Sequence, residues 1–71
     1  MIREGTKVKW KWGEGYATGK VIETSDDTME KTFDGSKIKR KGSKDNLALL
    51  IEQESGEKVL KLQSEVERAD E

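Results

Sequence analysis

The chain has 71 residues, of which 41% are charged and 31% hydrophobic, and its net charge is −1. This length suits one domain with a small core, which we expect over residues 1–71 with an ordered part from about 4 to 66. The lack of cysteine and histidine excludes disulfides, thiolate metal sites and imidazole catalysis, and no apolar run approaches the ~20 residues of a membrane span, so we expect a soluble, cytoplasmic monomer.

The first predicted strand runs from Thr6 to Trp12, after a loose lead-in over Met1–Gly5. Apolar and basic side chains alternate strictly along it, which is the period-two pattern of a half-buried strand. One face is therefore expected to carry Val8, Trp10 and Trp12, and the other Lys7, Lys9 and Lys11.

A glycine loop, Gly13-Glu14-Gly15, joins this strand to a second one predicted from Tyr16 to Thr24. Alternation is lost after Gly19, and a glycine within a strand often marks a bulge or a sharp bend. We therefore expect the chain to turn a corner at Gly19. Ser25-Asp26-Asp27 is predicted to be a turn whose side chains accept hydrogen bonds from nearby backbone amides.

Two short strands, Thr28–Phe33 and Ser36–Lys41, are predicted to form a hairpin around Asp34-Gly35. Both turn residues tolerate the left-handed backbone conformation that a type I′ turn requires. The second strand is very basic, with Ile38 as its only apolar anchor. A lysine-rich strand of this kind suits an exposed sheet edge, because it discourages aggregation there.

The most apolar stretch of the chain is Asn46–Leu62. Its two apolar runs, Leu47–Ile51 and Val59–Leu62, flank a polar segment that ends in Ser55-Gly56. Two apolar runs around a glycine turn predict a β-hairpin. We expect this hairpin to form the centre of the fold, against which the other strands pack.

A helix is the alternative for the first of these two runs. After a turn at Gly42–Asp45, Ser43 would cap a helix with Leu47, Leu50 and Ile51 on one face. We favour the strand, because the run ends at a glycine turn and a matching apolar run follows at hairpin distance.

The end of the chain is predicted to close the fold. Gln63–Val66 is expected to form one turn of 3₁₀ helix capped by Ser64, with Val66 closing the end of the barrel, and Glu67–Glu71 is expected to fray. Five to six short strands with no long helix indicate an all-β protein, a small closed or nearly closed barrel.

Several short segments together resemble a known family. They are Gly5–Trp10, Gly19–Val21, Lys39–Lys41, Asp45–Ile51, Ser55-Gly56, Val59–Lys61 and Ser64–Val66. Their order and spacing resemble the hypervirulence-associated Tudor-like domains, over about residues 4–66, and the resemblance implies a small SH3-like (Tudor-like) barrel. One departure is Asn46, where the family pattern has proline after the aspartate. The resemblance implies little about the ligand.

Aromatic side chains suggest the first candidate site. Trp12 and Tyr16 flank the glycine loop and are predicted to form two walls of a shallow pocket, with Phe33 as a third. Tudor-type modules often hold methylated lysine or arginine between aromatic rings, because a soft cation is attracted to the ring face. The alternative is that these rings only cover the ends of the barrel, as Trp10 is expected to fill the core. We expect the site to engage a protein or peptide.

A basic stretch supplies the alternative site, for nucleic acid. It consists of Lys37, Lys39, Arg40, Lys41 and Lys44, which Lys7, Lys9 and Lys11 would extend. Lysines of SH3-like barrels contact phosphate while aromatic rings stack on bases. A solvated edge is the simpler interpretation of such a run, and the overall pI of about 5.5 argues against strong electrostatic binding.

Nothing in the sequence indicates catalysis. The paired carboxylates Asp26-Asp27 lie in a predicted turn without an apolar pocket that would shift a pKa. The serines have no base to activate them, and no phosphate-binding glycine motif or EF-hand spacing is present. We therefore expect a non-enzymatic binding module without a cofactor or metal.

Overall fold

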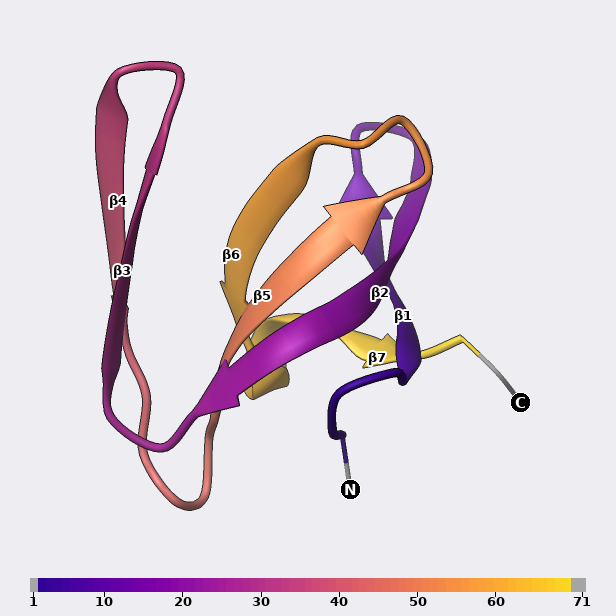
Figure 1. Ribbon diagram of the computed structural model, residues 1–71. Helices are drawn as coiled ribbons and strands as arrows, with labels where there is room; N and C mark the ends of the chain where they lie inside the picture. Colours follow the sequence, from indigo (N-terminus) through magenta and orange to yellow (C-terminus); the bar gives the residue numbers. More distant parts are fainter. Residues whose placement is uncertain (1, 70–71) are drawn as a thin grey trace.

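The computed structural model of the chain describes residues 2–69, which form seven strands and one turn of 3₁₀ helix (Figure 1). An antiparallel sheet has the order β6-β5-β2-β1-β7, and a separate two-stranded sheet pairs β3 with β4. The elements are β1 (Lys7–Trp12), β2 (Gly15–Ser25), β3 (Thr28–Phe33), β4 (Ser36–Lys41), β5 (Ala48–Gln53), β6 (Lys58–Leu62), η1 (Gln63–Glu65) and β7 (Glu67–Arg68).

The predicted all-β class is confirmed, and the described architecture is that of a small SH3-like barrel. Strands β1, β2, β5 and β6 form a meander, and β7 returns after the 3₁₀ turn to pair with β1. Strand β5 occupies Ala48–Gln53, so the helix alternative for this segment is wrong. The described residues form one strand more than the upper expectation of six, because the two-residue strand β7 gave no sequence signal.

Strand β5 lies at the centre because both of its faces are buried. Leu49 and Ile51 point into the barrel, where they pack with Val8, Trp10 and Val21. Ala48 and Leu50 point the opposite way, since successive side chains of a strand alternate between faces, and they pack with Met29 and Leu60. A strand covered on both sides needs a continuous apolar run, which explains why this stretch is the most apolar of the chain.

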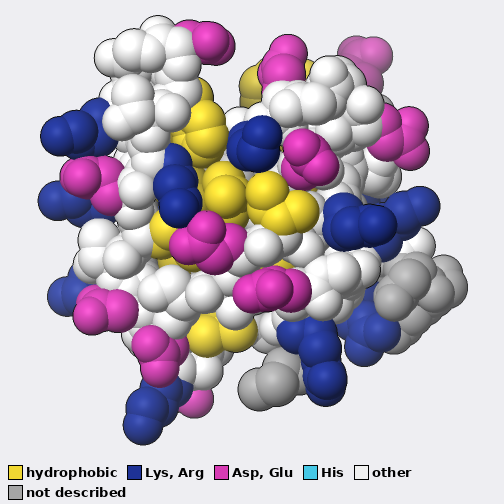
Figure 2. Space-filling model, viewed as in Figure 1, with side chains coloured by type: hydrophobic (Ala, Val, Ile, Leu, Met, Phe, Trp, Pro, Cys, Tyr) yellow, Lys and Arg dark blue, Asp and Glu magenta, His cyan; other side chains and the backbone are white. Residues whose placement is uncertain are grey.

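The β3–β4 hairpin, which we call the arm, covers the outer face of β5 and β6. In Figure 1 it stands beside the barrel, joined at its base to β2 and β5, and Figure 2 shows apolar side chains gathered between the two parts. Its inner face carries Met29, Lys31 and Phe33 from β3, with Ile38 and Arg40 opposite on β4. The turn at its tip has φ of 49° at Asp34 and 81° at Gly35, as a type I′ turn requires.

Two ion pairs also join the arm to the barrel. The Lys31 ammonium lies 3.0 Å from a carboxylate oxygen of Glu23 on β2. The Arg40 Nε atom lies 3.8 Å from a carboxylate oxygen of Glu65 in η1. Pairs this exposed contribute little to stability, so the apolar contacts of Met29 and Phe33 are the main cause of the docking.

The neck of the arm is a close crossing of the chain. Ser25 and Asp27 accept hydrogen bonds from the Asp27 and Thr28 amides, which confirms the predicted turn. Gly42 then donates its amide to the Asp27 carbonyl oxygen over 3.2 Å as the chain returns towards β5. A Cβ atom at Gly42 would lie 2.7 Å from the Ala48 nitrogen and 2.8 Å from the Ser25 oxygen, so a side chain does not fit there.

The bulge of β2 lies at a different residue from the one predicted. The register with β5 is regular through Gly19 and shifts between Val21 and Glu23, so Ile22 is the extra residue. Val21 consequently faces the barrel core and Ile22 packs on the arm side. Gly19 has another role: a Cβ atom there would lie 2.5 Å from the Ile51 Cγ2 atom and 2.8 Å from the Glu52 carbonyl oxygen. Close packing of β2 on β5 therefore requires glycine at this position.

Both ends of the described chain are more ordered than predicted. Ile2 is buried in the barrel core, so the lead-in is not loose there, and Glu67–Arg68 pairs with β1 as β7. Ser64 does not cap the 3₁₀ turn, because it is the Glu65 carboxylate that accepts the Leu62 amide at 2.8 Å. Val66 packs against the barrel core as expected. The predictions for residues 1, 70 and 71 lie outside the described residues.

Asn46 links the turn after the arm to the 3₁₀ turn. Its side-chain oxygen accepts the Ser64 amide at 2.8 Å, while its backbone exchanges hydrogen bonds with Ser43. A proline at this position has neither the side-chain acceptor nor the backbone donor, so these hydrogen bonds depend on the departure from the family pattern.

In residues 2–69 no helix has the length and apolar character of a membrane span.

Candidate binding surface

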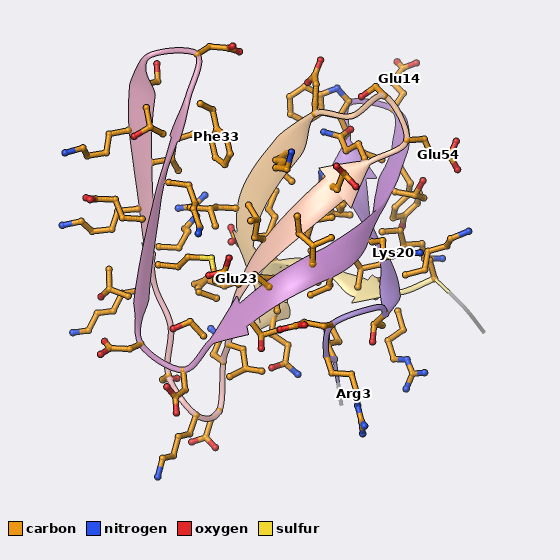
Figure 3. All side chains as sticks on the ribbon, in the orientation of Figure 1. Arg3, Glu14, Lys20, Glu23, Phe33 and Glu54 are labelled. Carbon is orange, nitrogen blue, oxygen red and sulfur yellow. The ribbon has the colours of Figure 1, made fainter. Side chains whose placement is uncertain are left out.

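Three hairpin turns lie at the same end of the molecule. Figure 1 shows the β1–β2 turn, the β5–β6 turn and the tip of the arm on the same side, and Figure 3 places Glu14 and Glu54 at the first two of these turns. The β1–β2 turn is tight, with Trp12 opposite Gly15 and a φ of 59° at Gly13. This end presents the exposed aromatic side chains together with irregular, solvated backbone, as binding surfaces of small barrels do.

A groove of about 370 Å³ runs from Trp12 to the arm. We call it the Trp12 groove. Its apolar walls are Trp10, Trp12, Ala17, Ile38, Val59 and Leu60, and its charged or polar rim is Arg40, Gln53, Glu57 and Lys61. The barrel and the arm both contribute, so the groove exists only because the arm is docked.

Trp12 is the largest exposed apolar side chain among the described residues, at 73% of its surface. Trp10, two residues earlier on the same face, is only 4% exposed, as its predicted core position requires. The difference arises because β1 ends at Trp12, beyond the part of the strand that the core covers. A bare indole at the mouth of an apolar groove is typical of a contact site for a partner.

Tyr16 does not share a pocket with Trp12. In the β1–β2 register Tyr16 lies opposite Lys11, and Trp12 lies opposite Gly15. Directly opposite residues point to the same face, and neighbours along a strand to opposite faces, so the two rings lie on opposite sides of the sheet. The expectation of a pocket with these two walls is wrong. Tyr16 is 60% exposed, and the Lys9 ammonium lies 5.3 Å from the centre of its ring.

Phe33 lines a different depression. Its ring points from the arm towards the barrel (Figure 3), and it borders a hollow of about 500 Å³ between the arm tip and the β5–β6 turn. Figure 2 shows this hollow as a notch in the surface. The notch and the Trp12 groove share Glu57 in their walls. Phe33 therefore lies beside the groove without forming a cage with Trp12.

The predicted basic stretch is divided between two faces of the arm. Lys37, Lys39 and Lys41 point outward, while Arg40 points into the Trp12 groove. The outward face also carries Glu30, whose carboxylate lies 4.0 Å from the Lys39 ammonium. Lys44 lies beyond the strand, in the turn before β5. The structure thus brings three of the five predicted basic residues together and leaves no aromatic ring beside them on that face.

Reasoning from sequence missed the residues that complete the groove, namely Ile38, Arg40, Glu57 and Leu60. Two of them were noticed in other roles, Ile38 as an anchor and Arg40 as part of the basic stretch. The period of β4 contained the signal, because Ile38 and Arg40 alternate with three lysines and so share one face. Among residues 2–69 no three acidic, histidine or cysteine side chains come together as metal ligands.

The family model for the TUDOR domain of hypervirulence associated proteins matches residues 5–66. The match extends from the residues before β1 to the residue after η1, and it therefore includes the arm and every residue of the Trp12 groove. No curated protein and no solved structure matches the chain.

Proposed function

Because this chain belongs to the family of hypervirulence-associated TUDOR domains, we propose that it is a non-enzymatic module that binds a segment of another protein in the Trp12 groove. Tudor-like domains are small binding modules, generally without catalytic activity. The observation that carries the proposal is the exposed Trp12 indole at the mouth of a groove built from both the barrel and the arm.

The groove favours a peptide over an isolated methylated ammonium group. A methyl-lysine cage surrounds the cation with several aromatic faces. Here the groove has two indoles, of which Trp10 is 4% exposed, and Tyr16 and Phe33 lie elsewhere. Ile38 and Leu60 instead offer aliphatic contacts, and Arg40 and Glu57 offer charged ones. Mixed apolar and polar contacts along a groove are what a peptide with several side chains uses.

Trp12→Ala is expected to weaken binding of groove ligands by about tenfold or more, equivalent to about 1.4 kcal/mol, because it removes the main exposed apolar contact. The ligands would be peptides selected on the wild-type domain from a random phage-displayed library. Tyr16→Ala is the matched control, since it removes a similarly exposed ring from the opposite face of the same hairpin. Isothermal calorimetry on each variant gives the affinities. Equal losses in both variants, or a loss only in Tyr16→Ala, would contradict the proposal.

Nucleic acid is the less favoured partner. Lys37, Lys39 and Lys41 lie on the outer face of the arm, which points away from the Trp12 groove. We expect the protein to elute from an immobilised oligonucleotide at low salt, since few lysines engage phosphate at once. Retention that falls steeply with salt, and that Lys39→Gln reduces, would support the nucleic-acid alternative over the peptide.

A further inference from the structure

The Trp12 groove follows the free edge of β6. Val59 and Lys61 belong to one face of this strand and Leu60 to the other, yet all three line the same groove. A groove lined from both faces of a strand lies along its edge. Strand β6 is the last strand of its sheet, and its partner β5 lies on the other side.

Backbone groups at this edge are unpaired among the described residues. The Gln53 amide bonds the Glu57 carbonyl oxygen at 2.8 Å and the Gln63 amide bonds the Leu47 carbonyl oxygen at 2.8 Å, so these pairs bracket the β5–β6 ladder. Hydrogen-bonded and open positions alternate in an antiparallel ladder, so Val59 and Lys61 bond β5 while Lys58 and Leu60 direct their N–H and C=O groups outward. Within residues 2–69 the outward groups of Lys58 and Leu60 have no hydrogen-bond partner.

The charges around the edge favour an acidic partner. Arg40 and Lys61 border the groove, whose lining holds one carboxylate, that of Glu57. Lys58 begins the strand, and its ammonium lies 3.6 Å from a carboxylate oxygen of Glu52. The Arg40 Nε atom is buried and lacks a hydrogen-bond partner among the described residues, because its nearest carboxylate oxygen, on Glu65, is 3.8 Å away. An arginine side chain with an unused donor can bind a second carboxylate, and a guanidinium can hold a carboxylate through two parallel hydrogen bonds.

From these three features we propose that the occupant is an extended acidic segment that adds to β6 as a further antiparallel or parallel strand. This deepens the proposed function and rests on it. Leu60 and Lys58 exchange backbone hydrogen bonds with the segment, an apolar side chain of the segment lies between Trp12, Ile38 and Leu60, and a carboxylate meets Arg40. Strand addition supplies affinity through the backbone and specificity through alternate side chains. A second copy of this chain is disfavoured, because it would bring the cations of both β6 edges together.

The test uses three synthetic heptapeptides in which polar and apolar residues alternate. One has glutamate at the polar positions, one has lysine there, and the third repeats the acidic sequence with alternate backbone nitrogens methylated so that it cannot pair. We expect the acidic peptide to slow hydrogen exchange of the Leu60 and Lys58 amides by about tenfold or more at saturation. The lysine and N-methylated peptides are expected to bind at least about tenfold more weakly.

Arg40→Gln is expected to lower the affinity of the domain for the acidic peptide. Lys39→Gln removes the same charge from the opposite face of β4 and is expected to leave that affinity unchanged. If Trp12 signals shift while Leu60 exchange stays fast, strand addition is wrong and the peptide groove of the proposed function stands. If the acidic peptide changes neither the Trp12 signals nor the Leu60 amide exchange, or if the lysine peptide binds as tightly, the proposal of an acidic partner is wrong. If Leu60 exchange slows with protein concentration alone, the occupant is a second copy and the proposal is overturned.

Discussion

Leu49→Ala is expected to lower the free energy of unfolding by about 2–5 kcal/mol, which is most of the stability available to a domain of this size. Leu49 is fully buried, and it packs in the barrel core with Val8, Val21 and Ile51. Removing its three side-chain carbons beyond Cβ loses their burial and leaves a cavity that strands on both sides of β5 prevent from collapsing. Urea unfolding followed by tryptophan fluorescence measures the change, because buried Trp10 reports on the same core.

Leu62→Ala is the control for this prediction. Leu62 is a leucine of the neighbouring strand β6 that is only partly buried, on the arm side. The same chemical change there is expected to cost clearly less, because less apolar surface is lost and solvent can fill the space. A cost for Leu62→Ala equal to or above that of Leu49→Ala would show that the barrel core is not where we place it.

Gly42→Ala is expected to destabilise the protein by about 1–3 kcal/mol or more, as overpacking of a rigid site does. The three nearest atoms to an added Cβ are backbone atoms, at 2.7 Å from the Ala48 nitrogen, 2.8 Å from the Ser25 oxygen and 2.9 Å from the Asp27 oxygen. Backbone cannot rotate out of the way as a side chain can, so the neck of the arm must open. We therefore expect Gly42→Ala to weaken the binding of groove ligands as well, since the arm supplies Ile38 and Arg40 to the groove.

Gly15→Ala provides the matched comparison. Nothing lies within 4 Å of a Cβ atom at Gly15, and its φ is not positive, so the change is expected to be neutral or stabilising by about 0.4–1 kcal/mol. Thermal unfolding of the two variants in parallel distinguishes them. Similar melting temperatures for Gly42→Ala, Gly15→Ala and the wild type would mean that the neck is not packed as described.

Local patterns predicted most of the strands because each carries its own signal. Strict alternation identified β1, the Asp34-Gly35 turn identified the arm, and the two apolar runs around Ser55-Gly56 identified β5 and β6. The doubly buried position of β5 is also visible in sequence, as four consecutive apolar residues from Ala48 to Ile51. These features depend on neighbours along the chain, which a sequence shows directly.

Features that depend on contacts between distant residues were not predictable in the same way. The role of Gly19 depends on the approach of Glu52, which lies in another strand, and the bulge at Ile22 depends on how β2 serves both the barrel and the arm. Strand β7 forms because its residues meet β1 and not because of their own propensity. Trp12 and Tyr16 are four residues apart, and only the two-residue turn between Trp12 and Gly15 decides that their rings face opposite ways.

The docked arm supplies one side of the Trp12 groove. Without it, β6 would present a flat free edge and Trp12 would stand alone at a barrel end. With it, the edge becomes one wall of a groove that also has Ile38 and a partly buried guanidinium, that of Arg40. The arm is held mainly by Met29 and its apolar neighbours, so binding and stability are expected to respond together to changes at that contact.

The central claim is that the arm is packed on β5 and β6 in the free protein, so that the groove is formed before any ligand arrives. Nuclear Overhauser effects between the Met29 methyl group and the methyl groups of Ala48, Leu50 and Leu60 test this most directly, because these four side chains form one buried cluster. We predict strong effects at all temperatures below unfolding, with arm amides as rigid as those of the barrel. Absence of these effects, with arm amides that tumble independently of the barrel, would contradict the account.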